Sequence, residues 1–368
     1  MKQTELVARR PHNSVGTVTR LDGLLIDAPL DPHECSASPP PPWRVHIVLR
    51  NNRLCVRLCG FCGSALITSF VVSVFSYVQF MSTAIANSPQ PRQIGAYSSV
   101  GSGAGIAGFT SGAYQIAVSD DPMTSAQDSS APRKFTIPLA LSTYSFVTKY
   151  PGAASFNVPG CLLAKIFLGK VRVPWSAISP GKSGYIEPVA RLDKSGTTEL
   201  ISQYFLSQGC NWPAALKNSQ ASWGWSGVTY KTGSGGVGSY VQGHKFSIGY
   251  VQSGVASTYG LTLLKIQNRA NDYVRATKAD PAQSIPRILP SPGVSWSSVT
   301  LINTIGVQTY PIVFFEYAFA RVKYPSTGNG KIAKVFLTYS QGTKFSGLLG
   351  HYFFYQLPSK VTTPSKII

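Results

Sequence analysis

The stretch VARLDKSGTTELISQYF, residues 189–205, places an arginine four residues before Ser-Gly-Thr-Thr, directly ahead of a pattern that predicts an amphipathic helix. A helix N-terminus carries unpaired backbone N–H groups and the positive end of the helix dipole, so it attracts anions. Ser195 and Thr197 add hydroxyl donors, and Gly196 allows close approach of the backbone. Arg191 adds a planar double donor that suits a tetrahedral oxyanion. Nothing in this arrangement breaks bonds, and the stretch indicates a site that holds an anion.

An ordinary capped helix is the alternative explanation of the same residues. Ser195 is a common N-cap, and Glu199 lies close enough downstream to complete a capping box. Capping chemistry alone leaves both interpretations open.

The composition favours a small anion, or a negatively charged wall or membrane surface, over nucleic acid as the partner. The chain of 368 residues carries a formal net charge of +19, although only 13% of its residues are charged. Such an excess concentrates anions by long-range attraction, and nucleic acid is the competing partner for any basic chain. The basic residues are scattered without a long run of Lys and Arg, however, and no RNA-binding or zinc-finger signature is present. We therefore expect no nucleic-acid partner.

The six cysteines predict no metal site and no cofactor. Cys55, Cys59 and Cys62 lack a nearby fourth Cys or His at zinc spacing and run into an apolar segment. Cys161 and Cys210 are the two in the main body of the chain. They would form a disulfide in an oxidising compartment if their geometry permits it, which the sequence leaves open.

The N-terminal part differs from the rest. Residues 1–57 contain the tract SPPPP at 38–42 and little periodicity, which predicts a poorly structured extension. Residues 58–86 carry no charge, follow a basic flank and end in Ala-Ile-Ala. These are the parts of a secretory signal or a membrane anchor, and they imply an extracytoplasmic protein with membrane association through this segment. Because the segment begins more than fifty residues from the start, a misplaced start codon also remains open.

Beyond residue 93 the sequence alternates between strand and helix patterns, which predicts an α/β fold with open, largely parallel sheets and ligands at the carboxyl ends of strands. The predicted strands lie within 135–147, 245–252 and 311–322, the helices within 161–169 and 198–208, and glycine-rich turns at 101–105 and 233–238. A glycine-rich turn alone is a weak signal. The segment AVSDDPMT at 117–124 adds Asp120 and Asp121, for which solvated loop acids are the ordinary explanation.

Together these segments resemble the phosphate-specific substrate-binding proteins of ABC transporters, in the type 2 periplasmic-binding-protein superfamily. The matching pieces occur in family order over about residues 93–360: YSSVGSGAGIAGF, IAVSDDPMT, LLAKIFLGKVRVPWSAISPG, VARLDKSGTTELISQYF, GGVGSYVQGHKFSIGYVQ, TYPIVFFEYAF and QLP. The resemblance implies two lobes with a ligand cleft between them, roughly 64–141 plus 309–368 and 142–308. It also implies a protein that is not an enzyme, with a permease and ATPase as partners.

Residue by residue, the resemblance implies a phosphate site made by both lobes. Ser102 would donate from a helix start in the first lobe, and Asp120 would accept the proton of hydrogen phosphate. From the second lobe Arg191 and the segment 195–197 would close on the anion, with Asp193 steadying the arginine. Asp120 would thereby reject fully ionised sulfate, because a carboxylate repels an oxyanion unless a proton lies between them.

The chain departs from the family at its first strand. Where the family has a glycine-rich strand and a Thr-Phe pair that contacts phosphate, this chain has Val74 and Phe75 within the apolar run. Phe75 would keep the backbone contact, but the threonine hydroxyl is missing. The segment 58–86 is therefore either a signal or anchor, or a degenerate first strand and helix. The departure also favours an alternative function, a structural or surface protein that reuses the fold with weak or no phosphate affinity.

Overall fold

The computed structural model describes residues 101–324, 327–340, 349 and 354–362, and four short strands nearer the N-terminus. The chain divides into two compact units, Met1–Ile67 and Thr68–Ile368. In the first unit, β1 (Val7–Arg9) pairs with β2 (Val15–Thr17) and β3 (Arg44–Arg50) pairs with β4 (Arg53–Cys59), both antiparallel. The remainder of the predicted extension, nearly all of the apolar segment 58–86, and Phe75 lie outside the described residues. Within the described part, no helix is long and apolar enough to cross a bilayer.

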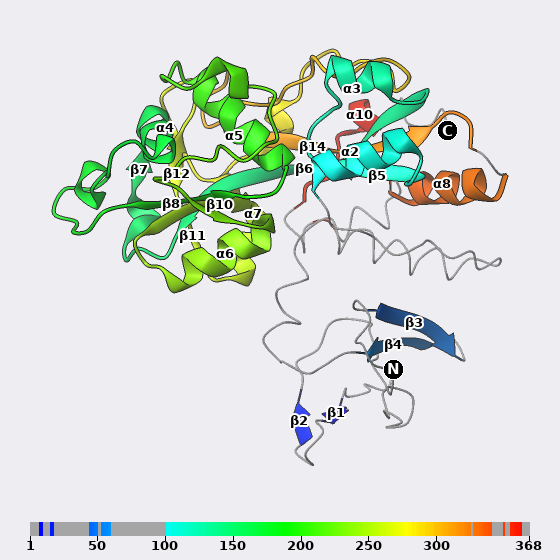
Figure 1. Cartoon of the computed structure of the whole chain (residues 1–368), viewed down its shortest axis with the longest axis horizontal. Coiled ribbons are helices and arrows are strands. Elements are labelled where there is room, and N and C mark those ends of the chain that lie inside the picture. Colours follow the sequence, from blue (N-terminus) through cyan, green and yellow to red (C-terminus); the bar gives the residue numbers. More distant parts are fainter. Residues whose placement is uncertain are drawn as a thin grey trace. The chain divides into compact units, whose positions relative to one another are not determined.

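The second unit is built on a mixed sheet of seven strands with helices on its faces (Figure 1). Its elements in chain order are α2 (Ser102–Ser111), β5 (Ile116–Ser119), α3 (Ser125–Ser130), β6 (Lys134–Thr148), β7 (Asn157–Val158), α4 (Gly160–Leu168), β8 (Glu187–Arg191), α5 (Gly196–Ser207), β9 (Thr229–Lys231), α6 (Gly233–Gly243), β10 (Ser247–Gln252), α7 (Ser253–Thr258), β11 (Thr262–Leu263), β12 (Lys265–Gln267), β13 (Tyr273–Val274), β14 (Val313–Arg321), α8 (Thr327–Ser340) and α10 (Ser359–Thr362). In the described connections, short 3-10 turns lie at Ala153–Ser155, Trp175–Ala177, Ala214–Leu216, Ala276–Lys278 and Pro281–Ser284.

The long strand β6 divides this unit into two lobes. The main strand order is β5-β14-β6-β10-β8-β9, and β11 also pairs with β6. From Lys134 to Thr143, β6 pairs with β14, and from Tyr144 to Thr148 it pairs with β10. We call the part around β5, β14 and the first half of β6 lobe 1, and the part around β8, β9, β10 and the second half of β6 lobe 2. In lobe 2, α4 and α5 lie on one face of the sheet and α6 and α7 on the other (Figure 1).

The expectation of largely parallel sheets was wrong for lobe 1. The pairs β10–β8 and β8–β9 are parallel, but β14 is antiparallel to both β5 and β6, and β10 is antiparallel to β6. The physical reason is the path of the chain. It leaves lobe 1 along β6 and re-enters from lobe 2 along β14, and two neighbouring strands that connect at the same end must run in opposite directions.

The predicted helices and strands are confirmed to within a few residues, but both predicted glycine-rich turns were wrong. Residues 101–105 open α2, and residues 233–238 form the first half of α6. Tertiary packing overrides the weak helix propensity of glycine here. A Cβ on Gly238 would lie 2.6 Å from the ring of Tyr259, so the absence of a side chain lets α6 approach its neighbour.

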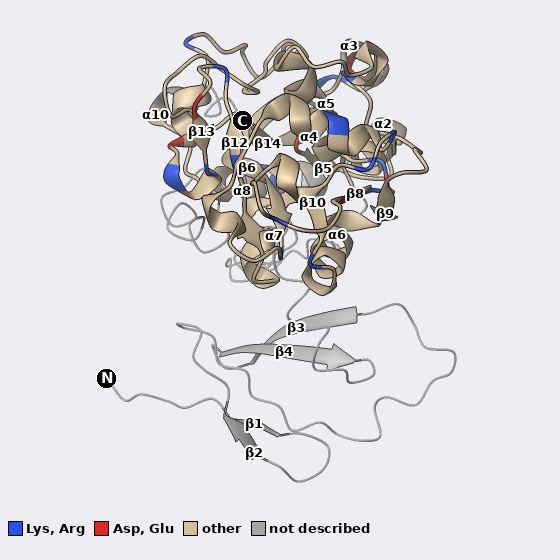
Figure 2. Ribbon diagram, turned by 90° about the vertical axis from the view of Figure 1, so that its left-hand side faces the viewer, with Lys and Arg blue, Asp and Glu red and all other residues tan. Residues whose placement is uncertain are grey.

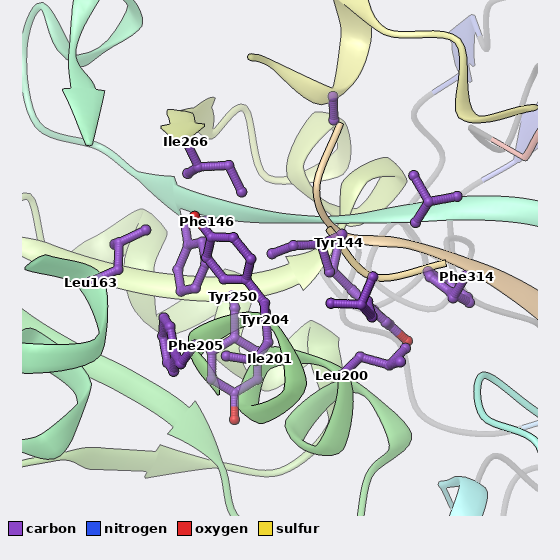
Figure 3. Close-up of a cluster of buried hydrophobic side chains, with 14 of the residues drawn as sticks. Tyr144, Phe146, Leu163, Leu200, Ile201, Tyr204, Phe205, Tyr250, Ile266 and Phe314 are labelled. Carbon is purple, nitrogen blue, oxygen red and sulfur yellow. The ribbon is translucent and has the colours of Figure 1, made fainter. Parts of the chain in front are cut away.

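A layer of aromatic side chains fixes α5 against the sheet. Phe146 of β6 stacks with Phe205 of α5 at a centroid distance of 5.8 Å, and Tyr204 and Tyr250 pack around it (Figure 3). All four rings are fully buried, and burial of each such side chain contributes roughly 1.5–3 kcal/mol. The body of α5 is thereby held in place, which positions its N-terminus.

Cys161 and Cys210 form a disulfide, with their Cα atoms 5.0 Å apart. The bond joins the beginning of α4 to the residues just after α5. This resolves the alternative that the sequence left open, and a disulfide of this kind is typical of proteins in oxidising compartments.

Candidate anion-binding site

The N-terminus of α5 is capped by Ser195, whose Oγ accepts a hydrogen bond from the Thr197 N–H at 3.1 Å. Ser195 and Thr197 are both buried. The capping box expected from Glu199 does not form, because Glu199 is the fourth helical residue and the box requires the third, which is Thr198. The Glu199 carboxyl instead accepts a bond from Gln203 at 3.4 Å.

Arg191 ends strand β8 and is buried beside this helix start. Its Nε donates to Asp193 Oδ1 at 2.9 Å, and a second guanidinium nitrogen donates to Asp193 Oδ2. The remaining nitrogen donates to Thr197 Oγ1 at 3.3 Å and to Ser234 Oγ at 3.2 Å. Burial opposes ionisation of Asp193, but its bonds to Arg191 hold the pKa of this carboxyl below its usual value. Asp193 therefore fixes the orientation of the arginine as an ion pair.

The lobe 1 side of the site starts from a second helix N-terminus. Ser102 is the first residue of α2, and its Oγ accepts a bond from the Asp120 N–H at 3.4 Å. Gly101 before it has φ 82°, a conformation that favours glycine. The Tyr144 hydroxyl donates to Asp120 Oδ2. Burial raises the pKa of Asp120, against the opposing effects of Tyr144 and Arg191.

The two helix N-termini meet where the lobes touch. A Cβ on Gly196 would lie 2.9 Å from Ser102 Oγ, 2.7 Å from Asp121 Oδ2 and 3.3 Å from Asp120 Cβ. A Cβ on Gly101 would lie 2.6 Å from the Lys194 carbonyl oxygen. The structure thus brings together all the predicted site residues that it describes: Ser102, Asp120, Arg191, Asp193, Ser195, Gly196 and Thr197. The contact of Phe75 stays a prediction.

Sequence reasoning missed two side chains at this site and misjudged two others. Tyr144 and Glu316 come from β6 and β14, and Glu199 faces Asp121 instead of capping its helix. Asp121 is not a solvated loop acid, because only 1% of it is exposed. A signal for Glu316 was present, since it is a single acid in the apolar run PIVFFEYAFA.

Burial raises the pKa values of the acids at the site other than Asp193. Burial, followed by the charges of Glu199 and Asp120, raises the pKa of Asp121 well above its usual value. Burial and the charge of Asp120 do the same for Glu316, and burial raises the pKa of Glu199 to about 7. Lys and Arg lie on several elements of the described part of the second unit (Figure 2). No group of three or more His, Cys, Asp or Glu in the described part could hold a metal ion.

The chain belongs to the family described as the PBP superfamily domain, whose model matches residues 77–343. It is similar to the phosphate-binding protein PstS 3 of Mycobacterium leprae, with 28% identity over 70% of this chain and 74% of the relative. It is also 28% identical to the phosphate-binding protein PstS of Xylella fastidiosa, over 66% of this chain and 69% of the relative. Among solved structures, a human phosphate binding apolipoprotein aligns with a TM-score of 0.64 and 18% identity, over 79% of this chain and 91% of that one. The fold is the two-lobed α/β fold of periplasmic binding proteins.

Proposed function

We propose that this chain binds inorganic phosphate, as hydrogen phosphate, in the cleft between its lobes. The observation that carries the proposal is the meeting of two helix N-termini from opposite lobes, at Ser102 and Gly196, with Asp120 beside both of them. Helix N-termini supply backbone donors and positive potential, and Arg191 adds a buried guanidinium. An anion that bridged the lobes would favour their closed arrangement.

Asp120 selects for a protonated anion. A buried carboxylate repels a fully ionised oxyanion such as sulfate, but it accepts a hydrogen bond from the P–OH group of phosphate. The Tyr144 donor keeps one oxygen of Asp120 occupied and so orients the other. In this proposal Ser102, Arg191, Ser195, Gly196 and Thr197 donate to the remaining phosphate oxygens, Phe75 adds a backbone contact, and Asp193 positions Arg191.

The proposed role is that of the substrate-binding component of phosphate uptake, without catalysis. The names of the relatives support phosphate as the ligand, and a permease and ATPase of an ABC transporter are the partners that this role requires. The role implies an extracytoplasmic location, with which the disulfide Cys161–Cys210 agrees. The proposed lobes are 64–141 plus 309–368 and 142–308. No observation on the structure favours the alternative of a structural protein without affinity for phosphate.

Isothermal titration of the purified chain with phosphate tests the proposal. We expect one site, no heat with sulfate, and a severe loss of affinity in Arg191→Ala and Asp120→Ala. Each charge-assisted hydrogen bond contributes roughly 1.5–3 kcal/mol, which corresponds to about 10- to 150-fold in affinity.

Arg172→Ala is the matched control for charge. Arg172 is exposed and stacks on Tyr185, so its loss removes the same charge away from the site. If both site variants bound phosphate as tightly as the wild type, the assignment of the site would be contradicted. The same holds if Arg172→Ala lost as much phosphate affinity as the site variants.

A further inference from the structure

Four carboxyl groups gather beside the two helix N-termini, and we call them the acid cluster: Asp120, Asp121, Glu199 and Glu316. Asp120 and Asp121 follow β5, Glu316 lies in β14, and Glu199 lies in α5. Tyr317 pairs with Ser119 in the sheet, so the register places Glu316 opposite Asp120. The cation that acts on Asp120 is Arg191, which is already paired with Asp193.

Asp121 is buried without a hydrogen-bond donor. Only 1% of the residue is exposed, and neither carboxyl oxygen receives a hydrogen bond. Its Oδ2 points at the first turn of α5, where it lies 2.7 Å from the position of a Cβ on Gly196. Glu316 is in the same situation, at 2% exposure with both oxygens unpaired. An unpaired carboxylate is costly in a buried site unless a proton or a cation neutralises it.

Among the residues that the structure describes, the groups whose charges act on Asp121 are acids and a tyrosine. Asp120 precedes it, Glu199 faces it from α5, and Glu316 and Tyr317 face it from β14. Around Glu199 lie Asp121 and the neutral side chains of Gln203 and Gln220. Two carboxylates both accept hydrogen bonds, so they bond to each other only when one of them carries a proton.

The pair Asp121–Glu199 also spans the two lobes. Asp121 belongs to lobe 1 and Glu199 to lobe 2, three residues along α5 from the contact at Gly196. The two carboxyls therefore approach each other only when the lobes are closed. Opening would return both groups to water, where each ionises readily near neutral pH.

We propose that Asp121 and Glu199 share one proton across the interlobe contact, so that phosphate capture is coupled to proton uptake and weakens as pH rises. This inference rests on the proposed phosphate function and assigns a regulation to the same site. Burial raises the pKa of Glu199 to about 7 and holds the pKa of Asp121 well above its usual value, so the pair keeps a proton at neutral pH and loses it as the pH rises further. Acidic surroundings would then favour capture, and a rise in pH would favour release.

Titration calorimetry of the full chain with inorganic phosphate tests the coupling. Measurement from pH 5.5 to 8.5 in two buffers of different ionisation enthalpy gives both the Kd and the number of protons taken up with each anion. The key variant is Glu199→Gln, in which an amide donates to Asp121 without a proton. The control is Asp280→Asn, an exposed helix cap that asparagine replaces well.

We expect the wild type and Asp280→Asn to take up more protons per phosphate than Glu199→Gln. Above the pH at which the pair loses its proton, the wild-type Kd should rise by about tenfold per pH unit relative to Glu199→Gln. Asp121→Asn should behave like Glu199→Gln. Agreement between the two variants would show that the effect does not come from a folding defect in one of them. Infrared spectra with phosphate bound should show a buried protonated carboxyl at neutral pH in the wild type, and this band should be missing without phosphate and in both variants.

Equal proton uptake in the wild type and both variants would overturn the coupling while leaving phosphate binding intact. Absence of heat with phosphate at every pH would overturn the phosphate proposal and the coupling together. The two failures are therefore distinguishable in one experiment.

Discussion

Gly196→Ala adds a single methyl group at the place where the two lobes meet. The new Cβ would lie 2.7 Å from Asp121 Oδ2 and 2.9 Å from Ser102 Oγ. Both distances are shorter than van der Waals contact between carbon and oxygen, so one of the groups must move. Gly196 is the first residue of α5 and has no positive φ, so alanine adopts its backbone without strain.

The magnitude follows from where the clash occurs. An extra methyl group in a close-packed contact costs about 1–3 kcal/mol. Because the clashing atoms belong to the other lobe, opening relieves this cost, and it appears only in the closed form. We therefore expect phosphate affinity to fall about 5- to 150-fold. Replacement of glycine in a helix also stabilises the folded chain by up to about 1 kcal/mol, so global stability should hold or rise.

Titration calorimetry for affinity and urea unfolding for stability measure the two effects separately. Gly243→Ala is the matched control, since Gly243 ends α6 and a Cβ there would meet nothing within 4 Å. Only Gly196→Ala should weaken phosphate binding. An unchanged Kd in Gly196→Ala would refute the reasoning that the lobes close on the anion at this point, and so would an equal loss in both variants.

Three further substitutions are predicted to act on separate interactions. Tyr144→Phe removes a donor from Asp120, which should raise the pKa of that carboxyl further and lower phosphate affinity by roughly tenfold or more in titration calorimetry. Glu199→Gln removes an acid whose folded-state pKa is raised from 4.5 to about 7. The stability contributed by Glu199 should therefore be complete below pH 4.5 and fall by about 3 kcal/mol as pH rises through 7, so the fall that urea unfolding measures should be smaller in the variant by about that amount. Cys161→Ser with Cys210→Ser opens a loop of 49 residues, which should cost about 4 kcal/mol of stability in the same assay.

Each of these predictions has a control or a contrary outcome. Tyr240→Phe removes a similar tyrosine–carboxylate bond, to Glu187, and should leave phosphate affinity unchanged. For Glu199→Gln, the same pH dependence of stability as in the wild type would contradict the burial of an ionisable group. For the cysteine variant, phosphate affinity should survive at temperatures where the chain stays folded. A loss of affinity there would show that the disulfide shapes the site.

The part of the site that is contiguous in sequence could be predicted. Arg191, Ser195 and Thr197 lie within one strand–loop–helix segment, so their spacing alone sets their geometry. The error at Glu199 was one of a single helical position. A shift of one residue turns a side chain by about 100° around a helix, which is enough to move it from the cap to the interlobe contact.

The part that depends on the register of distant strands could not be predicted. Glu316 lies opposite Asp120 because β14 returns next to β5, and Tyr144 reaches Asp120 at the point where β6 changes partner. No local pattern encodes either contact. The glycine-rich segments at 101–105 and 233–238 form helices for a related reason, since packing against neighbouring elements decides their conformation.

The position of β14 in the sheet has a consequence for the order in which the chain folds. This strand lies between β5 and β6, yet it is synthesised long after them, whereas all the main strands of lobe 2 are complete by Gln252. About 165 residues separate the end of β6 from the start of β14, which at ~5–20 residues per second is about 8–33 s of synthesis.

During that interval lobe 2 can form its sheet, but the first half of β6 has no partner along one edge. Ile137, Leu139 and Leu141 on this half are buried in the finished protein, and unpaired apolar edges favour aggregation. Arrested chains that end near residue 310 should therefore resist protease in lobe 2 and be cut in lobe 1, and equal cutting of both would contradict this order. The lobe that carries Asp120 is the last to fold and the one that depends on protection while the chain is being made.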